Sequence, residues 1–156
     1  MTTPPTTTTT PRRSWRRIAY GALLAWMVLS FTLGALTKFY WGETFFGPSY
    51  AVKFDGWGYP FWFRFVVATG ELVGAALLLN PRRRFLGAAM LFTITAGGSL
   101  THLINQDPLG HSVSAPLHMV LAALVAYLAD PSLVKQLFSP TAPPRPPSPR
   151  GSAGAG

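Results

Sequence analysis

Four long apolar runs occupy the middle of this chain. They cover residues 18–36, 61–79, 85–104 and 113–129, and the first has no charged residue in nineteen positions. A helix rises about 1.5 Å per residue, so such a run extends ~28 Å, close to the ~30 Å hydrocarbon core of a bilayer. A soluble bundle would need polar faces recurring every ~3.6 residues, which the first and third runs lack. The pattern therefore predicts an all-α integral membrane four-helix bundle.

Short polar segments separate the later runs. "NPRRR" at 80–84 places Pro81 where it ends the second helix, and "NQDPLGHS" at 105–112 joins the third helix to the fourth. The first run follows arginines, as in a signal peptide, but it exceeds the usual apolar region of ~7–15 residues. No A-x-A-like cleavage site follows it. We expect the run to be a retained signal anchor.

The positive charges predict the orientation. Ten lysines and arginines lie in the two tails and the 80–84 turn, whereas only Lys38, Lys53 and Arg64 lie on the other side. The positive-inside rule then places both termini in the cytoplasm. The same distribution accounts for the net charge of +8 without any binding of nucleic acid. Because the chain has no cysteine, it holds no disulfide and no cysteine-ligated metal.

One membrane domain, at about 15–138, lies between two tails. Residues 1–14 are rich in threonine and proline and residues 139–156 in proline and glycine, so both tails are expected to be disordered. A long external link runs from Thr37 to Pro60, and nine of its twenty-four residues are aromatic. Such residues favour the headgroup layer, so the preferred interpretation is an aromatic belt on the outer leaflet. The alternative is a lid over a site between the helices.

The ionisable residues of the predicted spans lie at the midplane or in the outer half. Glu71 is the eleventh residue of the second run, ~15 Å from either end. A charge at that depth costs ~2.5–3.5 kcal/mol, so we expect Glu71 to be protonated, or to face the interior and pair with His118, His102 or water. Arg64 leans outward and is not expected to pair with it. The candidate ligand or proton contacts are Glu71, His102, His118, Arg64, Lys38 and Asn105.

Simpler roles stay open for these residues. Glu71 could make a single interhelical hydrogen bond, and the histidines could be merely hydrogen-bonded or solvated. Arg64 and Lys38 could be anchors whose charges reach the headgroups. A haem between His102 and His118 is disfavoured because the two histidines form no spacing motif, and no metal site is predicted. Catalytic residues are not identified.

Small residues predict where two of the helices pack. Gly70 and Gly74 flank Glu71 on the second helix, and Ala89, Thr93 and Gly97 recur at four-residue spacing on the third. Stripes of this kind let membrane helices approach closely. We expect the second and third helices to meet along them, which brings Glu71 toward the bundle axis.

Three segments resemble the DoxX and DoxX-like membrane proteins. They are "LGALTKF" at 33–39, "FVVATGELVGAALLLNPRRRFLGAAML" at 65–91 and "LTHLIN" at 100–105. The most specific piece is G-E-x-x-G-x-x-L-L-L, which begins at Gly70, while Lys38 and His102 match a lysine and a histidine of the family pattern. The resemblance covers roughly Tyr20 to Leu128.

The resemblance implies a multi-pass protein of the bacterial inner membrane. The family takes its name from a membrane subunit of a thiosulfate:quinone oxidoreductase, and other members are associated with oxidative-stress handling. We therefore expect an accessory subunit of a redox or quinone-linked system that is not an enzyme on its own. Its outer-half pocket would hold a quinone or lipid, with Glu71 and His102 as polar contacts.

Two other functions stay open. A small transporter or channel-like oligomer could use Glu71 for proton or solute coupling, although no inverted repeat is evident. A structural assembly factor would need no ligand. The expected partners are the lipid bilayer and a redox membrane protein or further copies of this chain.

Overall fold

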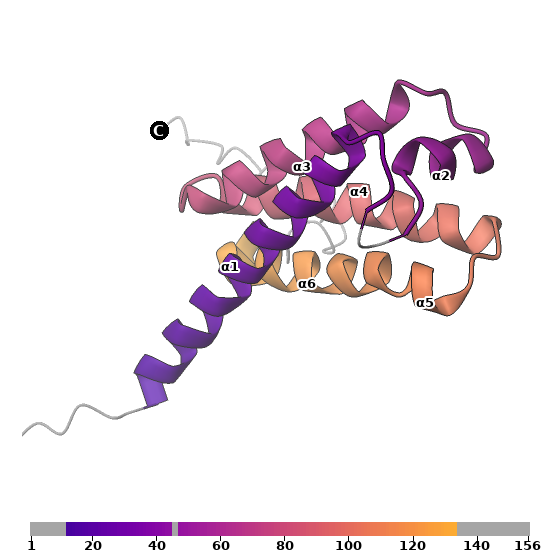
Figure 1. Cartoon of the computed structure of the whole chain (residues 1–156). Coiled ribbons are helices and arrows are strands. Elements are labelled where there is room, and N and C mark those ends of the chain that lie inside the picture. Colours follow the sequence, from indigo (N-terminus) through magenta and orange to yellow (C-terminus); the bar gives the residue numbers. More distant parts are fainter. Residues whose placement is uncertain (1–11, 45–46, 134–156) are drawn as a thin grey trace, which may run out of the picture.

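The structure, a computed structural model, describes residues 12–44 and 47–133. Within these ranges it is helical, and the only β-type pairing is an isolated bridge between Thr44 and Gly47. The predicted tails at 1–14 and 139–156 lie outside the described residues, apart from the first three residues of the first helix. Six helices follow one another (Figure 1), namely α1 Arg12–Phe39, α2 Tyr50–Gly56, α3 Phe63–Leu79, α4 Arg84–Ile104, α5 Leu109–Ser112 and α6 Ser114–Ala129.

The four long helices lie on the four apolar runs, with shifted ends. α1 is longer than the run at both ends, because neither the arginines before it nor Lys38 after it disfavours helix. α3 ends at Leu79, just before Asn80 and Pro81. Two helices are long and apolar enough to cross a membrane, over Trp15–Phe39 and Arg84–Ile104, and α6 is a shorter apolar helix.

The long helices form a row that is only partly closed. α1 packs against α3, α3 against α4, and α4 against α6, whereas α1 meets α6 over a short stretch. In Figure 1, α1 crosses the others at a slant and its N-terminal part extends beyond them. α2 lies at the end of the molecule opposite the turn that joins α3 to α4. The row therefore has two different ends, one with a tight turn and one with the aromatic link.

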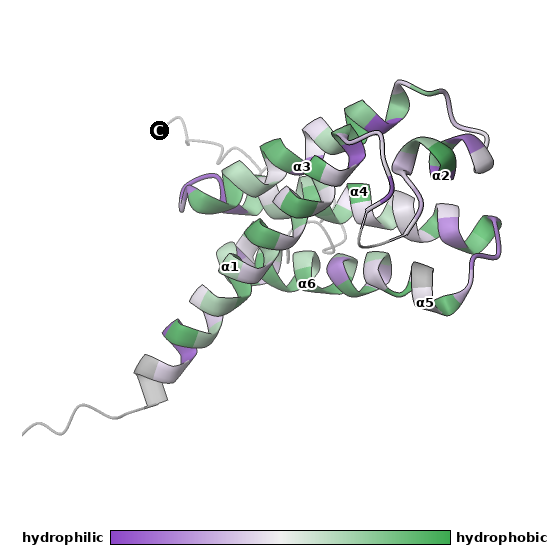
Figure 2. Cartoon of the chain, in the orientation of Figure 1, coloured by the Kyte–Doolittle hydropathy of each residue, from purple (hydrophilic) through white to green (hydrophobic). Residues whose placement is uncertain are grey.

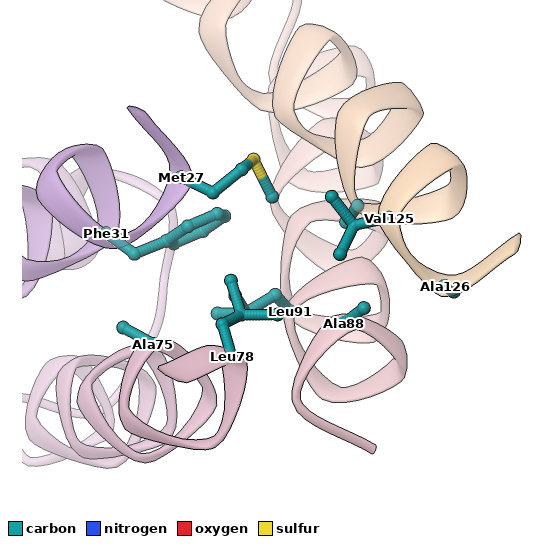
Figure 3. Close-up of a cluster of buried hydrophobic side chains, with 9 residues drawn as sticks. Met27, Phe31, Ala75, Leu78, Ala88, Leu91, Val125 and Ala126 are labelled. Carbon is teal, nitrogen blue, oxygen red and sulfur yellow. The ribbon is translucent and has the colours of Figure 1, made fainter. Parts of the chain in front are cut away.

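All four long helices contribute to one hydrophobic core. Met27 and Phe31 of α1, Leu78 of α3, Leu91 of α4 and Val125 of α6 point toward one another in Figure 3, and all are nearly inaccessible. Burying a side chain of this size stabilises a fold by about 1.5–3 kcal/mol. Large hydrophobic side chains are also exposed on all four long helices, and hydrophobic positions recur along each of them in Figure 2. Those outward faces suit a surrounding of lipid.

The contact between α3 and α4 is built on glycine, but not on the stripe that the sequence predicted. A Cβ on Gly74 would lie 2.7 Å from Leu91, and a Cβ on Gly87 would lie 2.8 Å from the carbonyl oxygen of Gly74. A Cβ on Gly70 would similarly lie 2.9 Å from Cδ1 of Ile94. The two backbones thus approach closely through Gly74 and Gly87.

The predicted stripe of Ala89, Thr93 and Gly97 is wrong as the α4 side of this contact. Thr93 and Gly97 are exposed, and a Cβ on Gly97 would meet nothing within 4 Å. Two residues turn a helix face by about 200°, so a stripe from residue 89 points away from one that starts at Gly87. The sequence contains both spacings, and only the packing of α3 selects between them.

Candidate functional site

A buried ion pair joins α1 to α3. Lys38 Nζ donates to Glu71 at 2.8 Å from Oε2 and 3.0 Å from Oε1, and each residue is 7% exposed. The same Nζ also donates to the carbonyl oxygen of Gly34 at 3.2 Å and lies 4.6 Å from the centre of the Tyr50 ring. The lysine is thereby surrounded by acceptors and one aromatic face. Such pairing is what makes two buried charges tolerable.

The partner of Glu71 differs from the prediction. The sequence predicts a protonated Glu71 or one paired with His118, His102 or water, and it leaves Lys38 open as an anchor at the headgroups. The geometry explains the difference, because helical side chains lean toward the N-terminus of their own helix. α1 and α3 run in opposite directions, so Lys38 leans inward and Glu71 leans outward. The long lysine then covers the remaining distance, and its side chain is turned into the protein.

A cavity of about 1180 Å³ lies beside this ion pair. It extends between the long helices on the side away from the hydrophobic core, beneath α2. Five of the six predicted contact residues line it, the exception being Arg64. They are Lys38, Glu71, His102, Asn105 and His118.

His118 contributes a buried nitrogen without a partner. Its Nδ1 lies 2.8 Å from the carbonyl oxygen of Ser114, and its ring packs against Trp26 and Phe31 with centroids 6.5 and 5.4 Å apart. Because a carbonyl oxygen only accepts, Nδ1 is the donor in this contact. Nε2 of the same ring is buried and has no hydrogen-bond partner.

The cavity is covered by contacts that the sequence did not predict. Asp107 Oδ2 accepts from Trp57 Nε1 at 3.0 Å and lies 2.6 Å from His102 Nδ1. The rings of Trp57 and His102 meet edge to face at 5.1 Å. Gln106 has a φ of 52°, and this left-handed turn folds Asp107 back onto the end of α4. In the sequence, the one signal for the contact between His102 and Asp107 is that Asp107 follows His102 by five residues.

A second tie fastens the segment after α2 to α4. The hydroxyl of Tyr59 lies 2.8 Å from Thr101 Oγ1, which itself donates to the carbonyl oxygen of Gly97 at 3.0 Å. Tyr59 is therefore the donor in its contact with Thr101. α2 adds Phe54, which is 5% exposed and packs against Trp57, Tyr59 and Phe63. We call this half of the link, residues 50–60, the lid, because it borders one end of the cavity as the alternative hypothesis expects.

Lys53 of α2 lies within the lid. Its burial is the main cause that lowers the pKa of its ammonium group, and the nearby charge of Lys38 lowers that pKa further. The charge of Asp107 acts in the opposite direction. Lys53 also lies 4.9 Å from the centre of the Tyr50 ring, so both lysines share one aromatic partner. The lid thus carries a lysine whose ammonium group lies over the Tyr50 ring.

Arg64 is held outside the cavity and is not a snorkelling anchor. Its guanidinium lies 4.2 to 4.8 Å from the ring centres of Trp41, Phe61 and Phe65, and the residue has no exposed surface. Nη1 donates weakly to the carbonyl oxygen of Tyr40 at 3.4 Å. The exposed ring of Trp41 in the link and that of Phe61 just after it suit an aromatic belt.

The described side chains offer no cluster typical of a metal centre. In residues 12–44 and 47–133, no three His, Cys, Asp or Glu side chains lie close enough together to hold a metal ion. The groups that a ligand could meet in the cavity are the carboxylate of Glu71, the ammonium of Lys38, the amide of Asn105 and the edge of His102. These groups suit hydrogen bonding to an organic headgroup.

The fold and the cavity define a class of protein: an all-helical chain with membrane-length apolar helices and an internal cavity that contains a buried ion pair. The chain belongs to the DoxX-like family, whose profile matches residues 22–127. This is a membrane-associated family, and the match confirms the resemblance seen in the sequence. No curated protein and no solved structure matches the chain significantly.

Proposed function

We propose that this chain is a multi-pass protein of the bacterial inner membrane, with α1, α3, α4 and α6 spanning it and both termini in the cytoplasm. α1 and α4 are long enough, while α3 and α6 have 17 and 16 residues and extend only ~26 and ~24 Å. The lid before α3 and α5 before α6 continue their outer ends and add thickness on that side. The arginines of the 80–84 turn and of the start of α1 then face the cytoplasm.

The proposed activity is the binding of an amphiphilic molecule with a polar headgroup in the cavity. The observation that carries it is the Lys38–Glu71 ion pair, which lines a cavity of about 1180 Å³ inside the helical bundle. Intramembrane charges are costly and are retained mainly where they contact a ligand, an ion or each other. A pair needed only for packing would lie between the helices without a cavity beside it.

The ion pair also indicates the chemistry of the headgroup. The hydrogens of Lys38 Nζ are directed at two carboxylate oxygens and one carbonyl oxygen. The carboxylate of Glu71 still has lone pairs free, so it accepts rather than donates. A headgroup with hydroxyl donors therefore fits better than one with carbonyls alone. The reduced form of a quinone has this chemistry.

We propose that the chain serves as an accessory subunit that holds this molecule for a redox partner in the membrane. The support is the family membership together with a cavity that offers hydrogen-bonding groups to an organic headgroup. A transporter that uses Glu71 is the second candidate, because protonation of this carboxylate would release Lys38. Glu71-dependent proton flux in proteoliposomes would favour that function instead.

The ligand is tested with decylubiquinol and decylubiquinone as probes. In mild detergent, we expect the quinol to raise the melting temperature of the native protein more than the quinone does. Glu71→Gln should weaken quinol binding about tenfold, as expected for losing a hydrogen bond to a charged group. Glu43→Gln, in the exposed link, is the matched control and should bind as the native chain does. If the native protein binds neither probe, the quinone proposal is wrong.

A further inference from the structure

The outer part of α4 presents a small-residue surface that helix packing does not use. Thr93 and Gly97 are exposed and also line the cavity. On the α3 side, Val66 lines the same cavity and is 53% exposed. Residues that are both exposed and cavity-lining mark a place where the cavity opens to the outside of the bundle.

Two contacts between neighbouring segments form the edges of this opening. Its lower edge is the contact of Gly70 with Ile94, below which α3 and α4 pack tightly through Gly74 and Gly87. Its upper edge is the hydrogen bond between Tyr59 and Thr101. A shallow apolar groove adjoins it on the outer surface and shares Val66, Gly70 and Met90 with the cavity.

We propose that this gap is a lateral window through which the apolar tail of a bilayer amphiphile enters the cavity while its headgroup meets the Lys38–Glu71 pair. The inference rests on the proposed function, and it adds that the ligand has a long tail and comes from the membrane. At the aqueous end the cavity is bordered by the ties of Trp57 and Tyr59 to the α4 side, and its exposed lining there is reached from water rather than from the bilayer.

The depth and chemistry of the rim support this assignment. Gly97 lies seven residues before the end of α4, which is ~10 Å along the helix axis and within the hydrocarbon layer if α4 spans the membrane. The hydroxyl of Thr93 donates to the carbonyl oxygen of Ala89, and that of Thr101 donates to Gly97. Both hydroxyls are therefore satisfied within α4, so the rim suits contact with an apolar chain.

The window can be closed without disturbing the helix contacts. A Cβ at Gly97 meets nothing within 4 Å, so Gly97→Phe should fold and should fill the gap. Gly21→Phe is the matched control, because Gly21 is an exposed helical glycine of α1 with equally open surroundings and lies outside the cavity. Thr93→Phe is a second variant at the window. Retention of helicity and of a single gel-filtration peak shows that each variant is folded.

The first measurement compares two quinols in nanodiscs, one with a decyl tail and one with no tail. Gly97→Phe and Thr93→Phe should weaken binding of the decyl quinol about tenfold or more, since the phenylalanine ring occupies the space that the tail would fill. Binding of the tail-less quinol should change less than about twofold. Gly21→Phe should leave both affinities unchanged. The window is overturned if the native chain and the three variants bind the decyl quinol with equal affinity. It is also overturned if the variants at the window lose affinity equally for both quinols.

The second measurement does not depend on quinone binding. Nanodiscs containing a phosphatidylcholine with a photoreactive diazirine near the end of one acyl chain are irradiated, and the labelled residues are mapped by mass spectrometry. The native chain and Gly21→Phe should carry label on Phe31 and Thr95, which are buried and line the cavity. Gly97→Phe should lose this label. If only outward-facing residues are labelled in every protein, the window is overturned even if a quinol binds. If interior residues are labelled but no quinol binds, only the quinone proposal is overturned.

Discussion

The pairing of Lys38 with Glu71 follows from the direction in which helical side chains lean. Each residue lies on a helix whose neighbour runs the opposite way, and each side chain leans toward the other. Their attraction in a poorly solvated interior is strong, but so is the cost of taking each charge out of water. The pair is consequently tolerated as a unit, and each charge alone is not.

We expect either single substitution in this pair to be strongly destabilising. Glu71→Gln or Lys38→Met leaves one buried charge without its counter-charge, which costs about 3–5 kcal/mol of unfolding free energy. The double variant should recover most of this loss, because it removes both charges. A double-mutant cycle measured by unfolding in mixed micelles checks this expectation. Single variants as stable as the native chain would show that the two charges do not form the pair in the membrane.

The contribution of Arg64 to stability depends on the flat shape of its guanidinium group. Its guanidinium stacks near three rings, a geometry that a lysine ammonium on a flexible stem does not reproduce. Arg64→Lys should therefore cost about 1–2 kcal/mol of stability, seen as a lower melting temperature in detergent. Arg82→Lys in the exposed turn keeps the charge and serves as the control, with no expected change. Equal melting temperatures for both variants would contradict the stacking argument.

At the scale of the helices, glycine determines how closely α3 and α4 approach. Gly74 and Gly87 face each other, and the carbonyl of one occupies the space where the other would carry a side chain. Backbone atoms yield less easily than the end of a flexible side chain, so this contact tolerates no added carbon. Above it the two helices separate, and the cavity begins where glycine contact ends.

Two alanine substitutions on the same helix should have opposite effects. Gly87→Ala places a carbon 2.8 Å from the Gly74 carbonyl oxygen and should destabilise the protein by about 1–3 kcal/mol. Gly97→Ala meets open space and should stabilise it by about 0.5–1 kcal/mol, because alanine favours helix over glycine. Thermal unfolding of the two variants side by side provides the measurement. A loss at Gly97 as large as that at Gly87 would place the α3–α4 contact elsewhere.

At the scale of the whole molecule, the two halves of the bundle differ in content. Near the turn between α3 and α4, side chains from four helices fill the interior with a dry core. Toward α2 the interior holds an ion pair, two histidines and a cavity beneath an aromatic lid. Under the proposed function, one half provides stability while the other binds the ligand.

The orientation in the membrane can be tested with single cysteines, since the chain has none of its own. Asp55→Cys in α2 and Arg82→Cys in the turn are both exposed positions. On right-side-out spheroplasts, a membrane-impermeant maleimide should label the cysteine at position 55 directly and the one at position 82 only after permeabilisation. The reverse pattern would place the arginine-rich turn outside.

The sequence alone determined the helical class, the four long helices and the residues around which a site could form. Apolar runs of membrane length and the proline that ends α3 are local signals, because each lies within one segment of the chain. It also placed Glu71 in the interior, because a carboxylate in a long apolar run has few other tolerable positions.

The tertiary structure decided which of these residues meet. It paired Glu71 with Lys38, turned the Gly87 face of α4 toward α3, and folded Asp107 back onto His102. Each outcome depends on how one helix is rotated and tilted against another, which is set by packing over many residues rather than by any short pattern. Spacing along a chain determines which side chains share a helix face, and only the packed fold determines what that face touches.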